Sequence, residues 1–281
     1  MTTFLIAGCG DLGTELGLRA DAAGHHVLGV RRNAAILPDP ITGIGADLTG
    51  EVPRLADDVD VLVITTAADG RDPDAYRRAY LDAPRTLLDA LERDRAVPRR
   101  VVFTSSTGVY GITDGSWVDE DTPAVPTSVT GEILVEAEEA LLRRRPDAVV
   151  LRLAGVYGPG RTRLIDQVRG GHAVIPDPPV HTNRIHRDDA AEALLHLAGL
   201  SDPAPCYLGV DDAPADKGEV LRFLAGELGV EHPPTGPVTR TRGGDKRCSN
   251  ARLTATGFTL TYPTYREGYR AVLAGIGTRH P

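Results

Sequence analysis

The chain is short of residues that mark several classes of protein. Only three of its 281 residues are cysteines (Cys9, Cys206 and Cys248); their wide spacing matches no metal-ligand pattern, and an odd number cannot all pair within one chain. We therefore expect reduced thiols and no metal. Lysine is almost absent, since Lys217 and Lys246 are the only two. The formal net charge of −8 argues against a nucleic-acid partner, because such binders carry a basic face.

Long apolar runs are also missing. No stretch approaches the roughly 18 apolar residues that span a membrane, so we expect no membrane partner. The apolar segment at residues 3–7 is too short for a signal peptide and has no basic region before it. We therefore expect a cytoplasmic protein. Hydrophobic residues make up 41%, which is enough to fill a sizeable core.

What is present is an alternation of short apolar runs with helical patterns. The apolar runs predict buried strands at residues 4–7, 26–30, 61–64, 101–103 and 148–151. Helical patterns cover residues 11–23, 73–95 (with Pro84 as a kink or restart point), 130–144, 188–200 and 218–228. This order is typical of βαβ units. We predict an α/β fold, a doubly wound parallel sheet (Rossmann fold) with a smaller C-terminal lobe.

The same pattern suggests how the chain is divided. We expect a dinucleotide-binding core over residues 1–155, to which residues 183–200 return. A substrate-binding lobe would comprise residues 156–182 and 201–281. Within it, residues 231–247 are rich in Pro, Gly, Thr and Arg, which predicts a mobile loop of the kind that forms lids over active sites.

A Gly-x-Gly-x-x-Gly pattern follows the first apolar run and opens the first helix. In such a turn Gly8 permits the tight bend, Gly10 lets the backbone approach a pyrophosphate, and Gly13 lets the helix pack on the strand. The helix end at Asp11 and Leu12 then offers free N–H groups and a positive dipole to the phosphates. These five residues are the predicted phosphate-binding part of a dinucleotide site.

The end of the second strand bears on which nicotinamide cofactor binds. NAD enzymes place a carboxylate there for the ribose 2′-OH, whereas this sequence has Arg31 and Arg32 with no acid nearby. Two guanidinium groups suit a 2′-phosphate, although they could also be a solvated pair. We expect NADP(H) as the cofactor in preference to NAD.

Two further segments belong to the predicted cofactor site. The Asp47 carboxylate, which precedes Leu48, could accept a hydrogen bond from the adenine amino group, or it could cap a turn. Thr65, Thr66 and Ala67 end another predicted strand, where small residues would let the dinucleotide lie close.

Three later motifs occur together in an order that a known family shares. Residues 103–111 carry a Ser-Ser-x-x-Val-Tyr-Gly strand end, residues 152–161 an Arg-x-x-x-Val-Tyr-Gly-Pro-Gly stretch, and residues 183–191 a His-x-Asp-Asp element. With them the chain resembles the extended short-chain dehydrogenase/reductase superfamily, also called the NAD-dependent epimerase/dehydratase family. The resemblance implies a nicotinamide dinucleotide, a small-molecule substrate and a substrate-contacting serine at Ser106. A homodimer through long core helices would be ordinary for this superfamily.

The catalytic pair of that family is missing. Its members carry a tyrosine followed four residues later by a lysine on one helical face, and the lysine lowers the pKa of the proton-transferring tyrosine. The matching positions here are Thr130 and Leu134, and no Tyr-x-x-x-Lys occurs anywhere in the chain. An aliphatic hydroxyl is a far weaker acid than a phenol. Leu134 shares an apolar helical face with its neighbours, which predicts a packing role.

Four residues are candidates for a catalytic role: Ser106, Tyr110, Thr130 and His186. Tyr110 is the phenol nearest to Ser106 in sequence, but it could equally be a packed structural tyrosine. His186 could act as an acid or base near neutral pH, or it could cap the helix that starts at Asp188.

The nature of the substrate is less defined by the sequence. Tyr157, Arg161, Arg163 and Arg184 lie in stretches that the family uses for substrate contact. If two of these arginines face the pocket, an anionic substrate is indicated; if they are solvated, nothing follows. Hydride transfer to an iminium or an activated alkene would need less proton help than carbonyl reduction.

Three functions are compatible with these features. The first is an NADP(H)-dependent oxidoreductase or epimerase/dehydratase-like enzyme with an atypical active site. The second is a non-catalytic NADP(H)-binding sensor or scaffold, and the third is a non-redox isomerase or cyclase on the same fold. The fold alone does not choose, because function depends on the site. The three predict, respectively, turnover with cofactor consumption, binding without turnover, and turnover without consumption.

Overall fold

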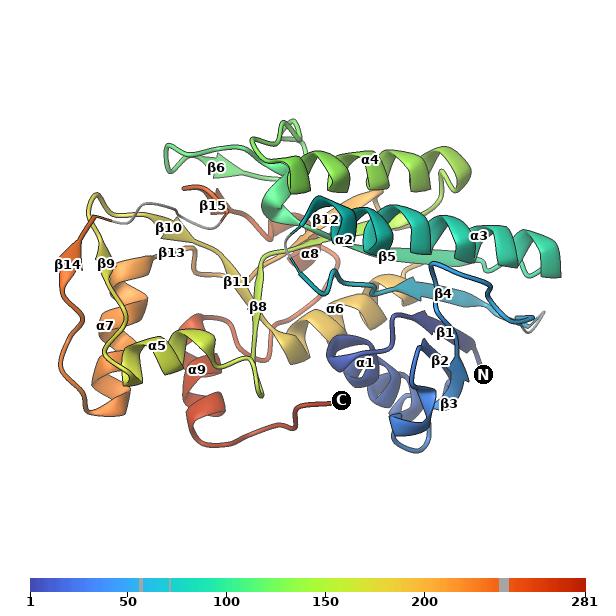
Figure 1. Cartoon of the computed structure of the whole chain (residues 1–281), viewed down its shortest axis with the longest axis horizontal. Helices are drawn as coiled ribbons and strands as arrows, with labels where there is room; N and C mark the ends of the chain where they lie inside the picture. The colour runs from blue at the N-terminus through green and yellow to red at the C-terminus, as the bar shows by residue number, and fades with distance from the viewer. Residues whose placement is uncertain (56–57, 71, 238–242) are drawn as a thin grey trace.

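A seven-stranded parallel sheet forms the centre of the computed structural model, which describes residues 1–55, 58–70, 72–237 and 243–281 (Figure 1). Its strands are β1 (Thr3–Ala7), β2 (His26–Arg31), β3 (Thr42–Gly45), β4 (Val61–Ile64), β5 (Arg100–Ser106), β7 (Val149–Leu153) and β12 (Cys206–Gly209). Their order is β12-β7-β5-β4-β1-β2-β3, so the chain winds outward from β1 in both directions. The predicted doubly wound α/β fold is confirmed. Ligands of such sheets bind at the carboxyl ends of the strands where the winding reverses, which here is between β1 and β4.

Helices cover both faces of this sheet (Figure 1). One face carries α1 (Asp11–Ala22) and α6 (Arg187–Gly199); the other carries α3 (Ala83–Asp94) and α4 (Val129–Arg144). Alternate residues of β1 pack on each side. Phe4 and Ile6 join the core with α1 and α6, whereas Leu5 and Ala7 join the core with α3 and α4. A strand buried on both faces requires a continuous apolar run, and the sequence has one at residues 3–7.

The long helix predicted over residues 73–95 changes character along its length. It consists of α2 (Pro73–Arg77), a π-helical turn η2 (Arg78–Asp82) and α3. Pro84 lies in the first turn of α3, where its missing N–H is not needed, so the predicted restart point is confirmed. The π-helical turn contains a carbonyl, that of Ala79, which accepts a hydrogen bond from Thr66 Oγ1 at 2.7 Å.

The remaining elements lie mainly beyond residue 106. They are η3 (Thr107–Val109), β6 (Trp117–Val118), β8 (Gly155–Tyr157), α5 (Arg163–Arg169), β9 (Ile175–Pro176), β10 (His181–Thr182), β11 (Arg184–His186), β13 (Ala215–Asp216), α7 (Lys217–Leu228), β14 (Thr235–Gly236), β15 (Arg247–Cys248), α8 (Ala251–Thr254) and α9 (Tyr265–Leu273), with η1 (Ala34–Ile36) after β2. A separate apolar cluster joins α5, α7 and α9. Part of the predicted loop 231–247, residues 238–242, lies outside the described residues.

Two features of the sheet differ from the prediction. Residues 206–209, assigned from the sequence to the lobe, form β12 and pair with β7 at one end of the main sheet. That boundary is therefore wrong, because a four-residue strand containing Gly209 gives only a weak apolar signal. The strand β3 was not predicted, since its sequence Thr-Gly-Ile-Gly is mostly exposed.

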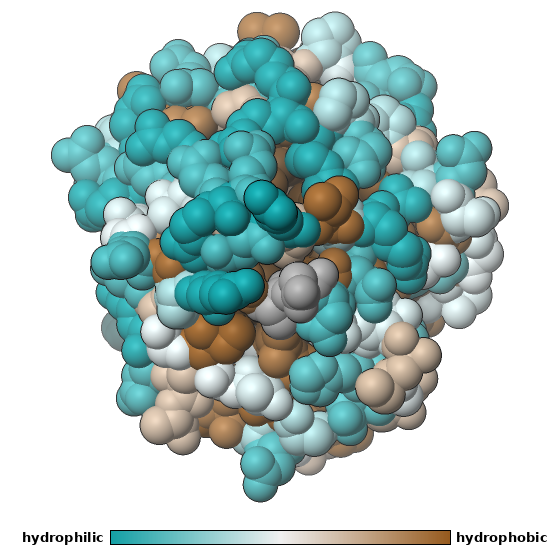
Figure 2. Space-filling model, turned by 90° about the vertical axis from the view of Figure 1, so that its right-hand side faces the viewer, coloured by the Kyte–Doolittle hydropathy of each residue, from teal (hydrophilic) through white to brown (hydrophobic). Residues whose placement is uncertain are grey.

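The side of the molecule that carries β3 and the end of α3 is mainly hydrophilic (Figure 2). Hydrophobic areas on this side are small and separated from one another. In the described part of the chain, no helix combines the length and apolar content that crossing a membrane requires.

Candidate functional site

The glycine turn between β1 and α1 is built as a dinucleotide turn requires. Gly8 has a positive φ of +82°, and a Cβ there would lie 2.7 Å from Thr66 N. A Cβ at Gly13 would lie 2.9 Å from Thr65 Oγ1, so only glycine lets α1 approach the β4 end this closely. Among the described residues a Cβ at Gly10 would meet only one atom within 4 Å, a carbonyl oxygen at 3.9 Å. The surface over the helix end is thus open to a ligand.

The two arginines at the end of β2 are not equivalent. Arg31 lies against the turn and donates through Nη1 to Cys9 O at 3.2 Å. The same nitrogen donates to the main-chain oxygen of Pro281 at 2.8 Å. Arg32 instead forms an ion pair with Asp69 at 3.1 Å, in which both side chains are more than two-thirds exposed. Arg31 is therefore the arginine held beside the phosphate turn.

The other predicted cofactor residues mainly shape the walls of the site. Asp47 accepts hydrogen bonds from Thr49 N (3.0 Å) and Thr49 Oγ1 (2.8 Å), which lower the pKa of this carboxyl. It caps its own turn, as one of the two interpretations expected. Leu48 is buried. Thr65 Oγ1 donates to Gly8 O at 3.1 Å and so fixes the glycine turn to β4.

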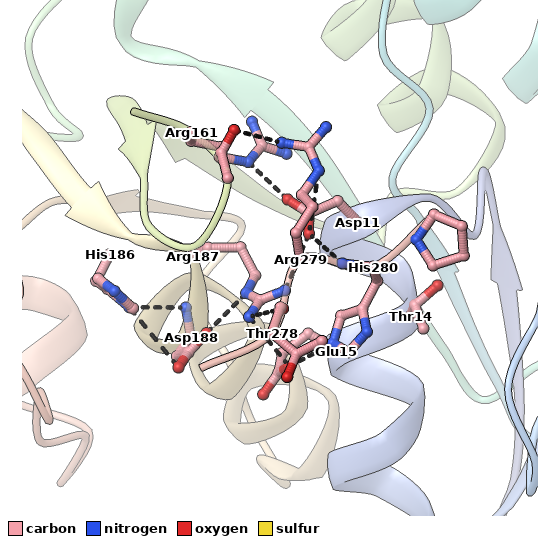
Figure 3. A network of polar contacts seen from close by, with 12 residues as sticks. Asp11, Thr14, Glu15, Arg161, His186, Arg187, Asp188, Thr278, Arg279 and His280 are labelled. Carbon is pink, nitrogen blue, oxygen red and sulfur yellow. Dashed lines mark hydrogen bonds and ion pairs between the residues drawn. The ribbon is translucent and has the colours of Figure 1, made fainter. Parts of the chain in front are cut away.

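Beside the glycine turn lies a dense network of charges (Figure 3). Asp11, the first residue of α1, forms ion pairs with Arg161 Nε at 2.7 Å and with Arg187 Nη1 at 3.0 Å. Burial acts to raise its pKa, but the hydrogen bonds from Arg161 and from the main chain of His280 outweigh this and hold it below the ordinary value. Arg187 also pairs with Asp188 at 2.7 Å and Glu15 at 3.4 Å, although its side chain is only 1% exposed. These contacts join α1, α6 and the loop after β8.

Residues 278–281, which we call the strap, complete this network (Figure 3). Besides the contact with Arg31, Arg279 of the strap donates to Gly160 O at 3.2 Å and lies 3.8 Å from Asp11 Oδ1, and Thr278 and His280 make three further polar contacts. Thr278 O accepts from Arg187 Nη2 at 2.9 Å, His280 N donates to Asp11 Oδ1 at 3.1 Å, and the His280 ring lies 2.8 Å from Glu15 Oε2. Sequence reasoning missed both Arg187 and the strap. A signal for Arg187 existed, because it replaces the apolar residue of the family's Val-Asp-Asp element.

The structure removes Tyr110 from the catalytic candidates. Its ring is 2% exposed, and its hydroxyl donates to Asp119 O at 2.8 Å while accepting from Arg152 Nη1 at 2.6 Å. Arg152 in turn pairs with buried Glu138 at 2.6 Å, and Ser105 Oγ bonds the same carboxylate at 2.5 Å. Burial raises the pKa of Tyr110 well above its usual range. Tyr110 is a structural residue, which was the alternative interpretation.

His186 is likewise structural. It is fully buried, and its Nδ1 accepts from Asp188 N at 3.2 Å, so it caps α6. The ring packs between Tyr157 and Tyr262, at centroid distances of 5.3 and 4.1 Å. Burial lowers the pKa of His186 to about 4, so the imidazole is neutral near pH 7. The capping role was one of the two interpretations of His186, and the burial of the ring argues against the acid–base role.

Aliphatic hydroxyls gather where the family's tyrosine would lie. Ser106, half-buried at the end of β5, accepts from Gly108 N at 3.1 Å. The loop after β5 packs on the first turn of α4, since a Cβ at Gly131 would lie 2.9 Å from Gly108 O. Thr130 is the second residue of that turn, and its hydroxyl lies 3.3 Å from Ser128 Oγ. Ser128 was missed by the sequence analysis; it caps α4 through Gly131 N at 3.2 Å.

The position of the family's lysine is filled by a packed leucine. Leu134 is 3% exposed and belongs to an apolar cluster with Val109, Val118, Leu208 and Cys248. Its predicted packing role is confirmed. Among the described residues, no ammonium group takes the place of that lysine: Lys246 is buried too, but donates to the carbonyl oxygens of Tyr110 and Gly243.

Two of the arginines considered for substrate contact share a hollow. Arg161 and Arg163 line a depression of about 470 Å³ together with Gly160, Thr162, Asp166, Gln167 and His172. An adjoining hollow of about 180 Å³ shares Gln167 and His172 and is lined by Lys217. Burial and the nearby Arg163 lower the pKa of Lys217. By contrast, Arg184 is buried and stacks on the Tyr265 ring at 5.3 Å, and Tyr157 is buried.

Comparison with known proteins agrees with this geometry. Residues 4–205 match the model of the NAD-dependent epimerase/dehydratase family, and the chain belongs to that family. It is 32% identical over 278 residues to Protein YeeZ of Escherichia coli (strain K12), covering 94% of this chain and 97% of the relative. A candidate NAD-dependent epimerase/dehydratase from Methylobacillus flagellatus superposes with a TM-score of 0.81 at 37% identity, covering 98% of each chain. MoeE5, solved in complex with UDP-glucuronic acid and NAD, gives a TM-score of 0.77 at 25% identity, covering 96% of this chain and 97% of MoeE5.

Proposed function

We propose that the protein is an NADP(H)-dependent oxidoreductase that reduces an activated C=N or C=C bond of a small anionic molecule. The cofactor part of this proposal rests on the glycine turn and on Arg31. Gly8 and Gly13 leave no room for a Cβ, as expected where the first glycine makes the tight turn and the third lets the helix pack on the strand, while the open surface at Gly10 would let the backbone approach a pyrophosphate. A relative, MoeE5, binds NAD on the same fold.

The single observation that carries the reaction class is the buried Leu134. Thr130 carries an aliphatic hydroxyl in place of the family's phenol. Without an ammonium group one helical turn away, this hydroxyl is not acidic enough to protonate an alkoxide efficiently. When bound, the cofactor would supply hydride, and the protein would then need only to orient the acceptor and exclude water. Acceptors that form a neutral amine or a stabilised carbanion place the smallest demand on a protein acid.

The hydroxyls of Ser106 and Thr130 would orient the acceptor. Ser106 Oγ accepts from Gly108 N, and this leaves the hydroxyl hydrogen for a ligand. The hollow lined by Arg161, Arg163 and, in its adjoining part, Lys217 supports an anionic substituent. The cationic residues of this hollow indicate the charge of the substrate, but they do not identify the substrate.

The first test is a fluorescence titration with NADPH and, separately, NADH. We expect NADPH to bind at least tenfold more tightly, and Arg31→Ala to weaken NADPH binding by about 10- to 100-fold, as expected for lost charge-assisted bonds. Arg32→Ala is the matched control, because Arg32 pairs with Asp69 in solvent. Equal affinities for the two cofactors in the native protein would refute NADP(H) selectivity.

The second test is a screen that follows NADPH loss with cyclic imines, nitroalkenes and enones, each with and without a carboxylate, beside simple ketones. We expect turnover in the first group only, favoured by the carboxylate. Tight NADPH binding with no turnover of any class would favour the sensor function. Product formation without NADPH loss would favour a non-redox enzyme.

A further inference from the structure

The strap lies along the flank of α1 that borders the glycine turn (Figure 3). Its polar contacts reach α1, α6 and the end of β2. Asp11, Arg187 and Arg31 each hold one main-chain atom of the strap, at 3.1, 2.9 and 2.8 Å. Arg279 adds a bond from Nη1 to Gly160 O at 3.2 Å. The strap is thus tied down by residues that come from four separate parts of the fold.

One of these contacts involves the guanidinium that the proposed function assigns to the 2′-phosphate. Arg31 Nη1 is shared between Cys9 O, an oxygen of the glycine turn, and the main-chain oxygen of Pro281. A phosphate bound to Arg31 would form charge-assisted bonds to the same guanidinium group. The strap and the phosphate therefore compete for the same donor.

We infer that the strap is a selectivity element of the dinucleotide site: it occupies Arg31 until a 2′-phosphate displaces it. This inference rests on the proposed function. NADP(H) offers Arg31 a dianionic group and can displace Pro281, whereas NAD(H) offers only a hydroxyl. The strap then lowers the affinity for NADP(H), whose binding depends on release of the strap, and has a smaller effect on NAD(H), which does not need Arg31.

A second observation supports the release of the four strap residues together. Asp11 is buried and pairs with Arg161 at 2.7 Å and Arg187 at 3.0 Å, whereas the half-exposed Arg279 of the strap lies farther away, at 3.8 Å. The shortest contact of the strap with Asp11 is the backbone N–H of His280, and its hydrogen bond with Arg187 is made by the backbone carbonyl of Thr278. Lifting the strap therefore removes individual hydrogen bonds and leaves the buried charges paired with one another.

The test compares the native protein with a variant that lacks residues 278–281 and with His280→Ala, which removes the ring contact with Glu15 at 2.8 Å. His232→Ala, at an exposed histidine, is the matched control. Dissociation constants for NADPH and NADH are measured by fluorescence, and thermal unfolding confirms that each variant is folded. We expect deletion to tighten NADPH binding about 5- to 10-fold, as for one competing hydrogen bond, with a smaller change for NADH. His280→Ala should give a change in the same direction, and His232→Ala none.

Hydrogen exchange adds a readout that does not depend on affinity. The amide of His280, which donates to Asp11, should exchange faster when NADPH is present and stay protected with NADH. An unchanged or weaker NADPH affinity after deletion, or equal tightening for the two cofactors, would overturn the inference. If Arg31→Ala leaves NADPH binding intact, the proposed NADP(H) function fails instead. If Arg31→Ala weakens binding but the strap variants do not change it, the selectivity role of the strap alone fails.

Discussion

Asp211 lies just after β12, and its burial predicts how the stability of the protein changes with pH. It is 1% exposed. Its Oδ1 accepts from Ala213 N at 3.3 Å, while Oδ2 has no hydrogen-bond partner within the described residues. Burial raises the pKa of Asp211 to about 7, and the nearby Arg184 offsets this only in part. The folded protein therefore holds this proton more tightly than the unfolded chain does.

The sign of the effect on stability follows from that difference. An aspartate with an ordinary pKa of 3.8 loses its proton in the unfolded chain at a pH where the folded protein keeps it. Stability from this group is therefore greatest in acid and falls as the pH rises from about 4 to about 7. Three pH units at about 1.4 kcal/mol each give on the order of 4 kcal/mol.

Asp211→Asn should remove this dependence while keeping the size of the side chain. Unfolding in urea at pH 5 and pH 8 measures it. We expect the variant to gain stability relative to the native protein between pH 5 and pH 8, by a few kcal/mol. Asp212→Asn is the control, because Asp212 is the exposed neighbour, bonded to Asn250 at 2.6 Å. An Asp211→Asn variant that is destabilised equally at both pH values would refute the reasoning, since it would mean an ionised, paired carboxylate.

The titration of His186 has the opposite effect on stability over part of the same pH range. Burial lowers its pKa from 6.5 to about 4, so the unfolded chain binds the proton more readily. Stability from this group is present above pH 6.5 and is lost as the pH falls toward 4. Between these values the two contributions oppose each other. In the Asp211→Asn variant the loss of stability in acid due to His186 should therefore become visible.

Three further predictions follow from contacts described above. Gly8→Ala should cost about 1–3 kcal/mol and abolish dinucleotide binding, because of the positive φ and the approach to Thr66; unfolding and titration measure both. Glu138→Gln should cost about 3–5 kcal/mol by leaving Arg152 buried without its counter-ion, and an unchanged melting temperature would contradict this. Leu134→Lys should destabilise the protein by several kcal/mol at neutral pH, and less at high pH where the amine is neutral; equal loss at both would point to steric strain alone.

Most of the fold was predictable because its signals are local. Buried parallel strands need continuous apolar runs, and the runs at residues 4–7 and 61–64 became β1 and β4. Pro84 marked the start of α3 for an equally local reason. The strands β3 and β12 escaped prediction because edge position, and not sequence pattern, gives them their pairing.

The candidate site was predictable only where backbone geometry dictates the residue. Gly8 and Gly13 fall in this class, since the contacts around them exclude any side chain. Tyr110 and His186 do not, because the same motif residue can face a ligand or the core, and only packing decides. The strap could not be foreseen: its contact with Asp11 joins residues 269 positions apart.

That separation along the chain also sets an order of events during synthesis. Arg31 and the glycine turn emerge from the ribosome early, whereas Pro281 follows Arg31 by 250 positions. At about 5–20 residues per second, this is an interval of roughly 12–50 seconds. The last strand of the sheet, β12, ends 72 positions before Pro281, so for roughly the final 4–14 seconds of that interval a nascent chain that has formed the sheet would present Arg31 to the cell's dinucleotide pool with no strap to displace. The first dinucleotide would then bind without competition from the strap, whereas every later one would compete with the strap for Arg31.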